Sequence, residues 1–148
     1  MNNSSLLLIS FSVGILVVIQ GGINARLGIL LNNTLLATSA ALVMSASFTL
    51  IAVLMTVREL PSTAQLQSIP TYMWFTGGAL SFMAVTLFYY IIPRIGISTA
   101  VVFGLSGQII FAAIAGHYGW FGMPMDPMTI KKVMGMIVMT IGVILIKY

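Results

Sequence analysis

Two amide side chains lie inside the first long apolar segment of the chain, where polar groups are rare. Gln20 and Asn24 are four residues apart, so in a helix they share one face. A buried amide in hydrocarbon is costly and usually faces a bundle interior or a polar cavity. The pair therefore indicates either hydrogen bonding between helices or a contact to a substrate. The spacing favours these two interpretations equally.

A third amide, Gln108, lies within a later apolar segment, next to small residues. Gly104 and Gly107 allow the backbone of a neighbouring helix to approach closely, but close packing does not explain the amide. We therefore favour a Gln108 that lines a cavity over one that is only packed. Gly135 and Gly142 are seven residues apart and form a similar stripe, which favours a dimer seam or another helix contact.

Aromatic side chains stand near both ends of another apolar segment. Trp74 is near its start, and Tyr89 and Tyr90 are near its end. Aromatic residues at such positions are first of all anchors at the membrane surface. As a second role we predict that Trp74, with Tyr89 or Tyr90, forms aromatic walls of the cavity that the three amides line.

The single histidine, His117, is flanked by Gly116 and Tyr118 in a stretch that we expect at the membrane surface. A lone histidine there is more often a polar residue at headgroup level than a proton carrier. Because histidine changes its charge near neutral pH, we keep a proton-responsive role as the lesser alternative.

Catalytic and metal chemistry have no candidate residues. The two acids, Glu59 and Asp126, both fall in connections between apolar segments, and cysteine is absent. No His, Asp and Glu cluster has the spacing of metal ligands, and no nucleophile is paired with a base. A phosphate-binding glycine loop is also missing. We therefore expect no enzyme activity, no metal site and no cofactor.

Composition places the chain in the membrane. Of its 148 residues 59% are hydrophobic and 5% are charged, whereas a soluble domain carries about 25% charged residues. The six Lys and Arg residues are dispersed, so nucleic acid is not an expected partner, and the lipid bilayer is. The apolar runs are continuous, which favours an all-α polytopic protein over a β-barrel. We predict one domain, 1–148, of five membrane-spanning helices at about residues 6–23, 35–57, 72–92, 97–115 and 128–146.

Several residues predict where these helices begin and end. Asn33 and Thr34 are typical of a helix start. Pro93 is predicted to end the third span, because proline disfavours helix at the residue before it. The glycines and prolines of residues 116–127 predict a loop at the membrane surface. We also expect the first helix to be retained, because its apolar run has no obvious cleavage site.

The positive charges divide evenly between the two sides of the predicted membrane domain. Membrane proteins orient by placing excess Lys and Arg in cytoplasmic loops, so an even division leaves the orientation undecided. An odd number of spans puts the two termini on opposite sides. Two copies inserted in opposite directions then reproduce the inverted repeats of many transporters. The N-terminal side carries Arg58, Lys131 and Lys132, and the other side carries Arg26, Arg94 and Lys147.

Residues 20–28, QGGINARLG, resemble the Q-x-x-x-N-x-x-L-G signature of the YdcZ family in the drug/metabolite transporter (DMT) superfamily. The resemblance continues in order along nearly the whole chain. One position departs from it, since the family pattern often has an acid where this chain has Gly116. The other matching elements are W-x-x-G-G at 74–78, P-x-x-G at 93–96, G-Q at 107–108, the H-x-G-hydrophobic part of D-H-x-G-hydrophobic at 117–120, and the last-helix glycines Gly135 and Gly142.

The resemblance implies a five-span protein of the bacterial inner membrane that is equivalent to half of a ten-span transporter. Together with the amides, it predicts a secondary exporter of small organic molecules that works as an antiparallel, dual-topology homodimer. Two alternatives stay open at this point. One is a small-ion channel, and the other is a non-transporting subunit that pairs with a paralogue.

Overall fold

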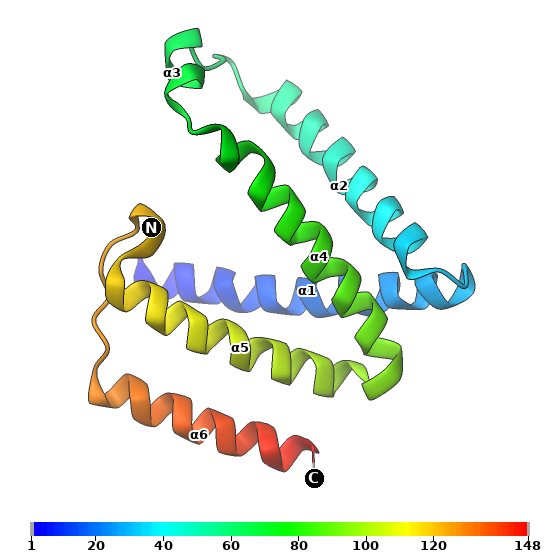
Figure 1. Ribbon diagram of the computed structural model, residues 1–148, viewed down its shortest axis with the longest axis vertical. Helices are drawn as coiled ribbons and strands as arrows, with labels where there is room; N and C mark the ends of the chain where they lie inside the picture. The colour runs from blue at the N-terminus through cyan, green and yellow to red at the C-terminus, as the bar shows by residue number, and fades with distance from the viewer. Residues whose placement is uncertain (1, 148) are drawn as a thin grey trace. The chain divides into compact units, whose positions relative to one another are not determined.

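The computed structural model describes residues 2–147, with side chains described for residues 2–146. Within these residues the chain is all-α, as predicted. It divides into two compact units, an N-terminal unit that ends at Arg94 and a C-terminal unit that starts at Ile95. The elements, labelled in Figure 1, are α1 (Asn3–Leu30), α2 (Thr34–Thr56), α3 (Thr63–Ser68), α4 (Thr71–Ile95), α5 (Ile97–Tyr118), the 3-10 turn η1 (Trp120–Gly122) and α6 (Ile130–Lys147).

Four helices among the described residues are long and apolar enough to cross a membrane: α1, α2, α4 and α5. α6 is different because its 18 residues include Lys131, Lys132 and Lys147. These lysines stand at its two ends, with an apolar stretch between them. The predicted position of the Lys147 charge lies outside the described side chains.

α1 and α2 form a hairpin that is closed by two consecutive asparagines. Asn32 takes the left-handed conformation, φ 50°, that ends a helix. The side chain of Asn33 then accepts hydrogen bonds from the backbone of Leu35 and Leu36 at 2.9 and 3.2 Å. The predicted helix start at Asn33 is thereby confirmed. Figure 1 shows the two helices diverging from this turn.

Small residues bring α1 and α2 together beside the turn. A Cβ atom on Gly28 would lie 3.5 Å from the Cα of Thr34 and 3.6 Å from the Cβ of Ala37. Ala37 and Thr38 are completely buried there, and Ala25 is 2% exposed. The hydroxyl of Thr38 donates to the carbonyl of Thr34 at 3.0 Å, so its burial leaves no polar group unpaired.

α4 crosses α1 at a second glycine. A Cβ atom on Gly21 would lie 2.8 Å from Cε1 of Phe88 and 3.4 Å from Cδ1 of Ile92. No side chain larger than hydrogen fits there without movement of the Phe88 ring. Between α2 and α4 the chain forms the short helix α3, which starts with a capping box between Ser62 and Gln65.

Proline 93 does not end its helix, contrary to the prediction. α4 continues through it to Ile95, and Gly96 with φ 85° follows. The fixed φ of proline is itself helical, so a helix can continue through it, although the ring removes one backbone hydrogen bond and crowds the carbonyl four residues earlier. The positive φ of Gly96 ends the helix instead.

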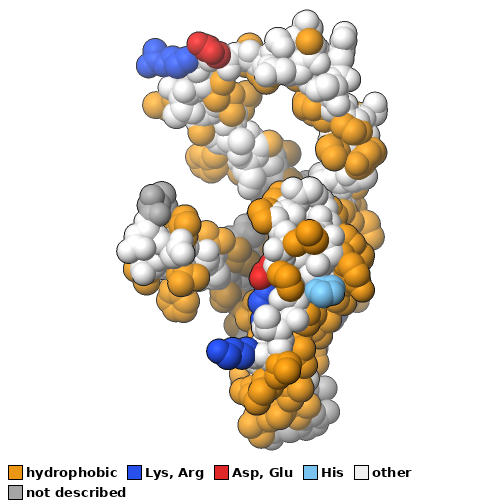
Figure 2. All heavy atoms as spheres, turned by 90° about the vertical axis from the view of Figure 1, so that its left-hand side faces the viewer, with side chains coloured by type: hydrophobic (Ala, Val, Ile, Leu, Met, Phe, Trp, Pro, Cys, Tyr) orange, Lys and Arg blue, Asp and Glu red, His pale blue; other side chains and the backbone are white. Residues whose placement is uncertain are grey.

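The C-terminal unit is a second hairpin, of α5 and α6, which lie side by side and antiparallel in Figure 1. α5 runs three residues beyond the predicted boundary at Ala115, because a helix tolerates glycine at a cost of about 1 kcal/mol. Gly119 with φ 63° is the residue that ends it. Figure 2 shows hydrophobic side chains over much of the surface and few charged ones.

Candidate functional site

The two amides of the first helix line a groove between α1 and α2. Its volume is about 260 Å³, and its lining combines polar and apolar side chains. α2 contributes Ser45 and Phe48 to it, and both lie near the middle of that helix. The structure therefore brings Gln20 and Asn24 to one site, as their spacing predicts. The full lining is Gln20, Asn24, Leu27, Ala40, Ala41, Met44, Ser45 and Phe48.

The two amides differ in their hydrogen bonding. The side-chain nitrogen of Asn24 donates to the phenolic oxygen of Tyr89 at 3.0 Å, which joins α1 to α4. Within the described part of the chain, the amide of Gln20 and the hydroxyl of Ser45 have no hydrogen-bond partner. Unpaired polar groups in hydrocarbon are unfavourable, so these two remain available to a molecule in the groove.

Among the described residues that line the groove, none is charged. Its polar groups are two amides and a hydroxyl, which both donate and accept hydrogen bonds. Phe48 and Met44 supply apolar surface beside them. Such a lining suits an uncharged molecule with one hydrogen-bonding end and one apolar end.

The three aromatic residues predicted as cavity walls have different surroundings. Tyr89 is 2% exposed and contacts Asn24. Trp74 is 56% exposed. The ring of Tyr90 lies 3.3 Å from the guanidinium carbon of Arg94, which stacks on it in a cation–π contact. Of the three, Tyr89 is therefore the one that the structure joins to the amides.

Two hydroxyl residues near this site were missed by the sequence analysis. Ser45 lines the groove, although its spacing from Ala37 and Ala41 is typical of simple packing. Thr86 lies one turn before Tyr89, and its Oγ1 is buried without a partner among the described residues. The sequence did offer a signal for both residues. Each is a hydroxyl residue that precedes an aromatic residue by three positions within an apolar run.

In the C-terminal unit Gln108 is exposed on α5 and lines neither of the two grooves between α5 and α6. Its predicted role in a cavity stays a prediction. Apart from the neighbouring backbone of the same helix, no described atom lies within 4 Å of a Cβ atom built on any of four glycines that were predicted to pack. Their predicted role in dimer or helix packing stays a prediction. These glycines are Gly104, Gly107, Gly135 and Gly142.

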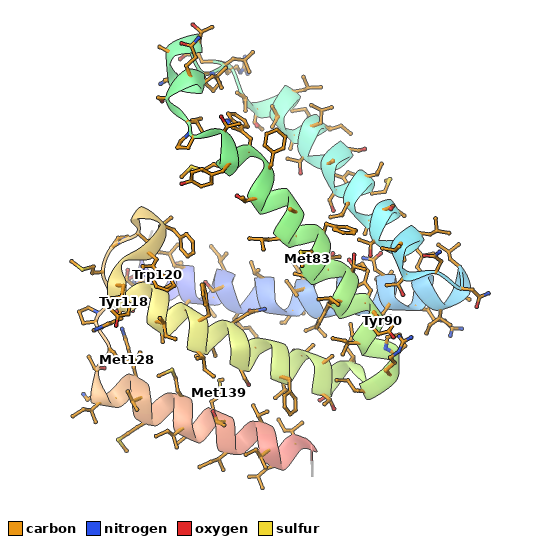
Figure 3. All side chains as sticks on the ribbon, viewed as in Figure 1. Met83, Tyr90, Tyr118, Trp120, Met128 and Met139 are labelled. Carbon is orange, nitrogen blue, oxygen red and sulfur yellow. The ribbon has the colours of Figure 1, made fainter. Side chains whose placement is uncertain are left out.

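Two grooves run along the contact between α5 and α6. The larger has a volume of about 410 Å³ and includes Asp126, Lys132 and Met139 in its lining. The smaller has a volume of about 340 Å³ and includes Met128. Figure 3 shows Met128 in the connection before α6 and Met139 on α6. Each groove thus takes one lining residue from the connecting loop.

The loop of residues 123–129 is attached to α5 and to α6. Asp126 forms an ion pair with Lys132 of α6. The backbone N–H of Asp126 donates to the carbonyl of Gly116 at 2.8 Å. The Cβ atom of Asp126 lies 3.6 Å from the place where a Cβ of residue 116 would stand, so Gly116 gives the acid room to pack.

His117 also holds the loop. Its Nδ1 accepts a hydrogen bond of 3.0 Å from the backbone N–H of Met128. The ring contacts the edge of the Tyr118 ring, with centroids 4.9 Å apart, and Tyr118 stacks on Trp120 at 6.1 Å. Figure 3 places these last two side chains at the end of α5. The side chain of His117 therefore helps to join the 123–129 loop to the end of α5.

Among the described residues, no three side chains of His, Cys, Asp or Glu come together as metal ligands would. The polar groups that the structure brings together are amides, hydroxyls, the imidazole of His117 with a backbone N–H, and one ion pair. Their chemistry is hydrogen bonding and charge pairing.

Comparison with known proteins agrees with the resemblance in the sequence. A family model described as "Putative inner membrane exporter, YdcZ" matches residues 5–145. No curated protein and no solved structure matches the chain.

Proposed function

The chain belongs to the YdcZ family of inner-membrane exporters, and from that premise we propose that it is a secondary exporter working as an antiparallel homodimer. The family is one of transporters and not of enzymes, and its location is the inner membrane. The substrate proposed is a small, uncharged organic molecule. The single observation that supports the proposal of a dimer is that the six Lys and Arg residues divide evenly between the two sides of the predicted five-span arrangement.

The proposal requires α6 to cross the membrane as a fifth span. Its 18 residues extend over about 27 Å at about 1.5 Å per residue, close to the roughly 30 Å of a hydrocarbon core. Lys131 and Lys132 stand in its first turn, from which long side chains reach the headgroups. Five spans put the termini on opposite sides, so a reversed copy supplies the second half of an inverted-repeat transporter.

The groove between α1 and α2 is the proposed substrate contact of each subunit. Among the described residues, the polar groups of Gln20 and Ser45 have no partner. The amide nitrogen of Asn24 bonds Tyr89, and its carbonyl oxygen has no partner among the same residues. None of the described lining residues carries a charge that would neutralise an ionic substrate. Gln108, Trp74 and Tyr90 remain predicted contacts of the assembled exporter.

Labelling of single cysteines in cells tests the orientation. The chain has no native cysteine, so Leu60→Cys, in the connection after α2, and Ser98→Cys, in the first turn of α5, give unique labels. A membrane-impermeant maleimide is added to intact cells and to inverted vesicles. Dual topology predicts that each cysteine is labelled from both sides, in about half of the molecules each time.

Labelling of each position from one side alone would contradict the antiparallel homodimer. A fixed orientation would instead favour pairing with a paralogue of opposite charge bias. Flux through the purified protein in liposomes distinguishes an exporter from the small-ion channel, because flux through a channel does not saturate and flux through an exporter does.

A further inference from the structure

Two hydrogen bonds of different kinds hold the 123–129 loop to the end of α5. One runs from the backbone of Asp126 to the carbonyl of Gly116. The other runs from the backbone of Met128 to Nδ1 of His117. A carbonyl oxygen keeps its lone pairs at any physiological pH, whereas an imidazole nitrogen can take up a proton. The second bond is therefore the one that acidity can break.

We propose that Nδ1 of His117 is a proton-binding site, and that proton uptake there breaks one of the two hydrogen bonds between the 123–129 loop and α5 and so loosens the loop. A backbone N–H can only donate, so the observed bond of 3.0 Å requires a lone pair on Nδ1 and the ring proton on Nε2. A proton on Nδ1 removes that lone pair and brings two N–H groups face to face. The proton and the amide of Met128 thus compete for one acceptor.

Loosening of the 123–129 loop changes the lining of both grooves of the C-terminal unit. Asp126 lines the larger groove and Met128 lines the smaller one. Both residues belong to the segment that the histidine holds. Binding of a proton at one atom therefore alters the lining of the two grooves together. A secondary exporter needs a coupling ion, and the junction makes the proton the ion that acts on this unit.

The charged and titratable groups around the histidine allow this exchange. On the loop and α6 sides, Asp126 and Lys132 form an ion pair, so their charges largely cancel. Lys131 is exposed beside them, and the neutral ring of Tyr118 is the titratable neighbour on α5. His117 stands in the last turn of α5, at the end of the helix where the backbone dipole is negative. The protonated ring is therefore accommodated at the helix end once the backbone N–H of Met128 has moved away from it.

A spin label on the loop tests the proposal without any measurement of transport. Met123→Cys carries the label, in full-length protein purified into lipid nanodiscs. Electron paramagnetic resonance then separates mobile from immobile label. When the sample is acidified from about pH 8 to about pH 5, the ratio of mobile to immobile label should rise about fivefold. This is the effect of losing one neutral hydrogen bond.

Two substitutions at the histidine separate protonation from other effects of acid. In His117→Asn the side-chain oxygen keeps an acceptor near the place of Nδ1 but does not titrate, so the label should stay immobile at both pH values. In His117→Ala the acceptor is gone, so the label should be mobile at both.

The proposal is overturned if the wild-type label does not respond to pH, or if the Asn variant responds as the wild type does. A second label, at Leu105→Cys on the exposed side of α5, controls for unfolding of the helix. A change there together with the loop would mean that acid unfolds α5, which also overturns local loosening of the loop. None of these outcomes depends on whether the chain exports a substrate.

Discussion

The side-chain amide of Asn24 donates a hydrogen bond of 3.0 Å to the phenolic oxygen of Tyr89, which is 2% exposed, and so joins α1 to α4. Hydrogen bonds of this kind between membrane helices contribute about 0.6 kcal/mol on average. Tyr89→Phe removes the oxygen and keeps the ring, and Asn24→Leu removes the amide. The two changes together should cost less than the sum of each alone, with a coupling of about 0.6 kcal/mol.

Unfolding of the purified protein in bicelles by added detergent measures this cycle. Tyr72→Phe, at the exposed start of the same helix, serves as the control for loss of a tyrosine hydroxyl. Strictly additive costs in the Asn24 and Tyr89 cycle would show that the bond contributes nothing to stability.

A methyl group at Gly21 should destabilise the crossing of α1 and α4. Its Cβ would lie 2.8 Å from Cε1 of Phe88, so the ring must move from its packed position. Overpacking of this size costs about 1 to 3 kcal/mol. Gly14→Ala in the same helix is the matched control, because a Cβ atom there meets no described atom within 4 Å.

The same unfolding measurement compares the two alanine variants. A third variant, Gly21→Ala with Phe88→Ala, removes the ring that the methyl group meets. If Gly21→Ala were as stable as Gly14→Ala, the close approach of the two helices at this glycine would be wrong.

Loss of the free amide in the groove should weaken the binding of uncharged molecules. Gln20→Leu removes a hydrogen-bonding group and keeps a side chain of similar size. One lost hydrogen bond corresponds to roughly a fivefold weaker affinity. The control is Gln67→Leu in α3, which is exposed and is not part of the groove lining.

A thermal-shift series measures this effect with neutral amides and alcohols as probes, each beside a carboxylate and an amine of the same carbon skeleton. Neutral probes should stabilise the wild type and the Gln67 variant alike, and the Gln20 variant less. Stabilisation by the carboxylates alone would contradict the uncharged substrate class.

Removal of two lysines should give the chain one orientation. With Lys131→Gln and Lys132→Gln, the N-terminal side keeps one basic residue, Arg58, against three on the other side. Excess Lys and Arg stay in the cytoplasm, so the N-terminus should move to the outer side. Arg26→Gln with Arg94→Gln reverses the imbalance and should hold the N-terminus inside.

Impermeant labelling at Leu60→Cys reads the orientation of both variants. The fraction labelled from outside should approach all molecules in the lysine variant and none in the arginine variant. Equal labelling of the two variants would mean that these charges do not direct insertion.

The helices themselves were largely predictable. In hydrocarbon every backbone polar group must be paired within the chain, so a long apolar run becomes a helix wherever it occurs. The boundary at Asn33 was confirmed because its side chain caps a helix locally. The boundaries at Pro93 and Gly116 were wrong, because proline and glycine only disfavour helix, and Gly96 and Gly119 with positive φ end α4 and α5 instead.

Sequence alone determined the all-α class, four of the five predicted spans, and the shared face of Gln20 and Asn24, since all of these follow from composition and helical periodicity. Tertiary structure decided which of those polar groups meet a partner. Periodicity gives a residue's direction around its own helix, whereas contact depends on where two helices cross. Small residues set that crossing: Gly28 and Ala37 close one hairpin, Gly21 admits the ring of Phe88, and Gly116 makes room for Asp126. Asn24 reaches Tyr89, and His117 reaches the backbone of Met128, for that reason.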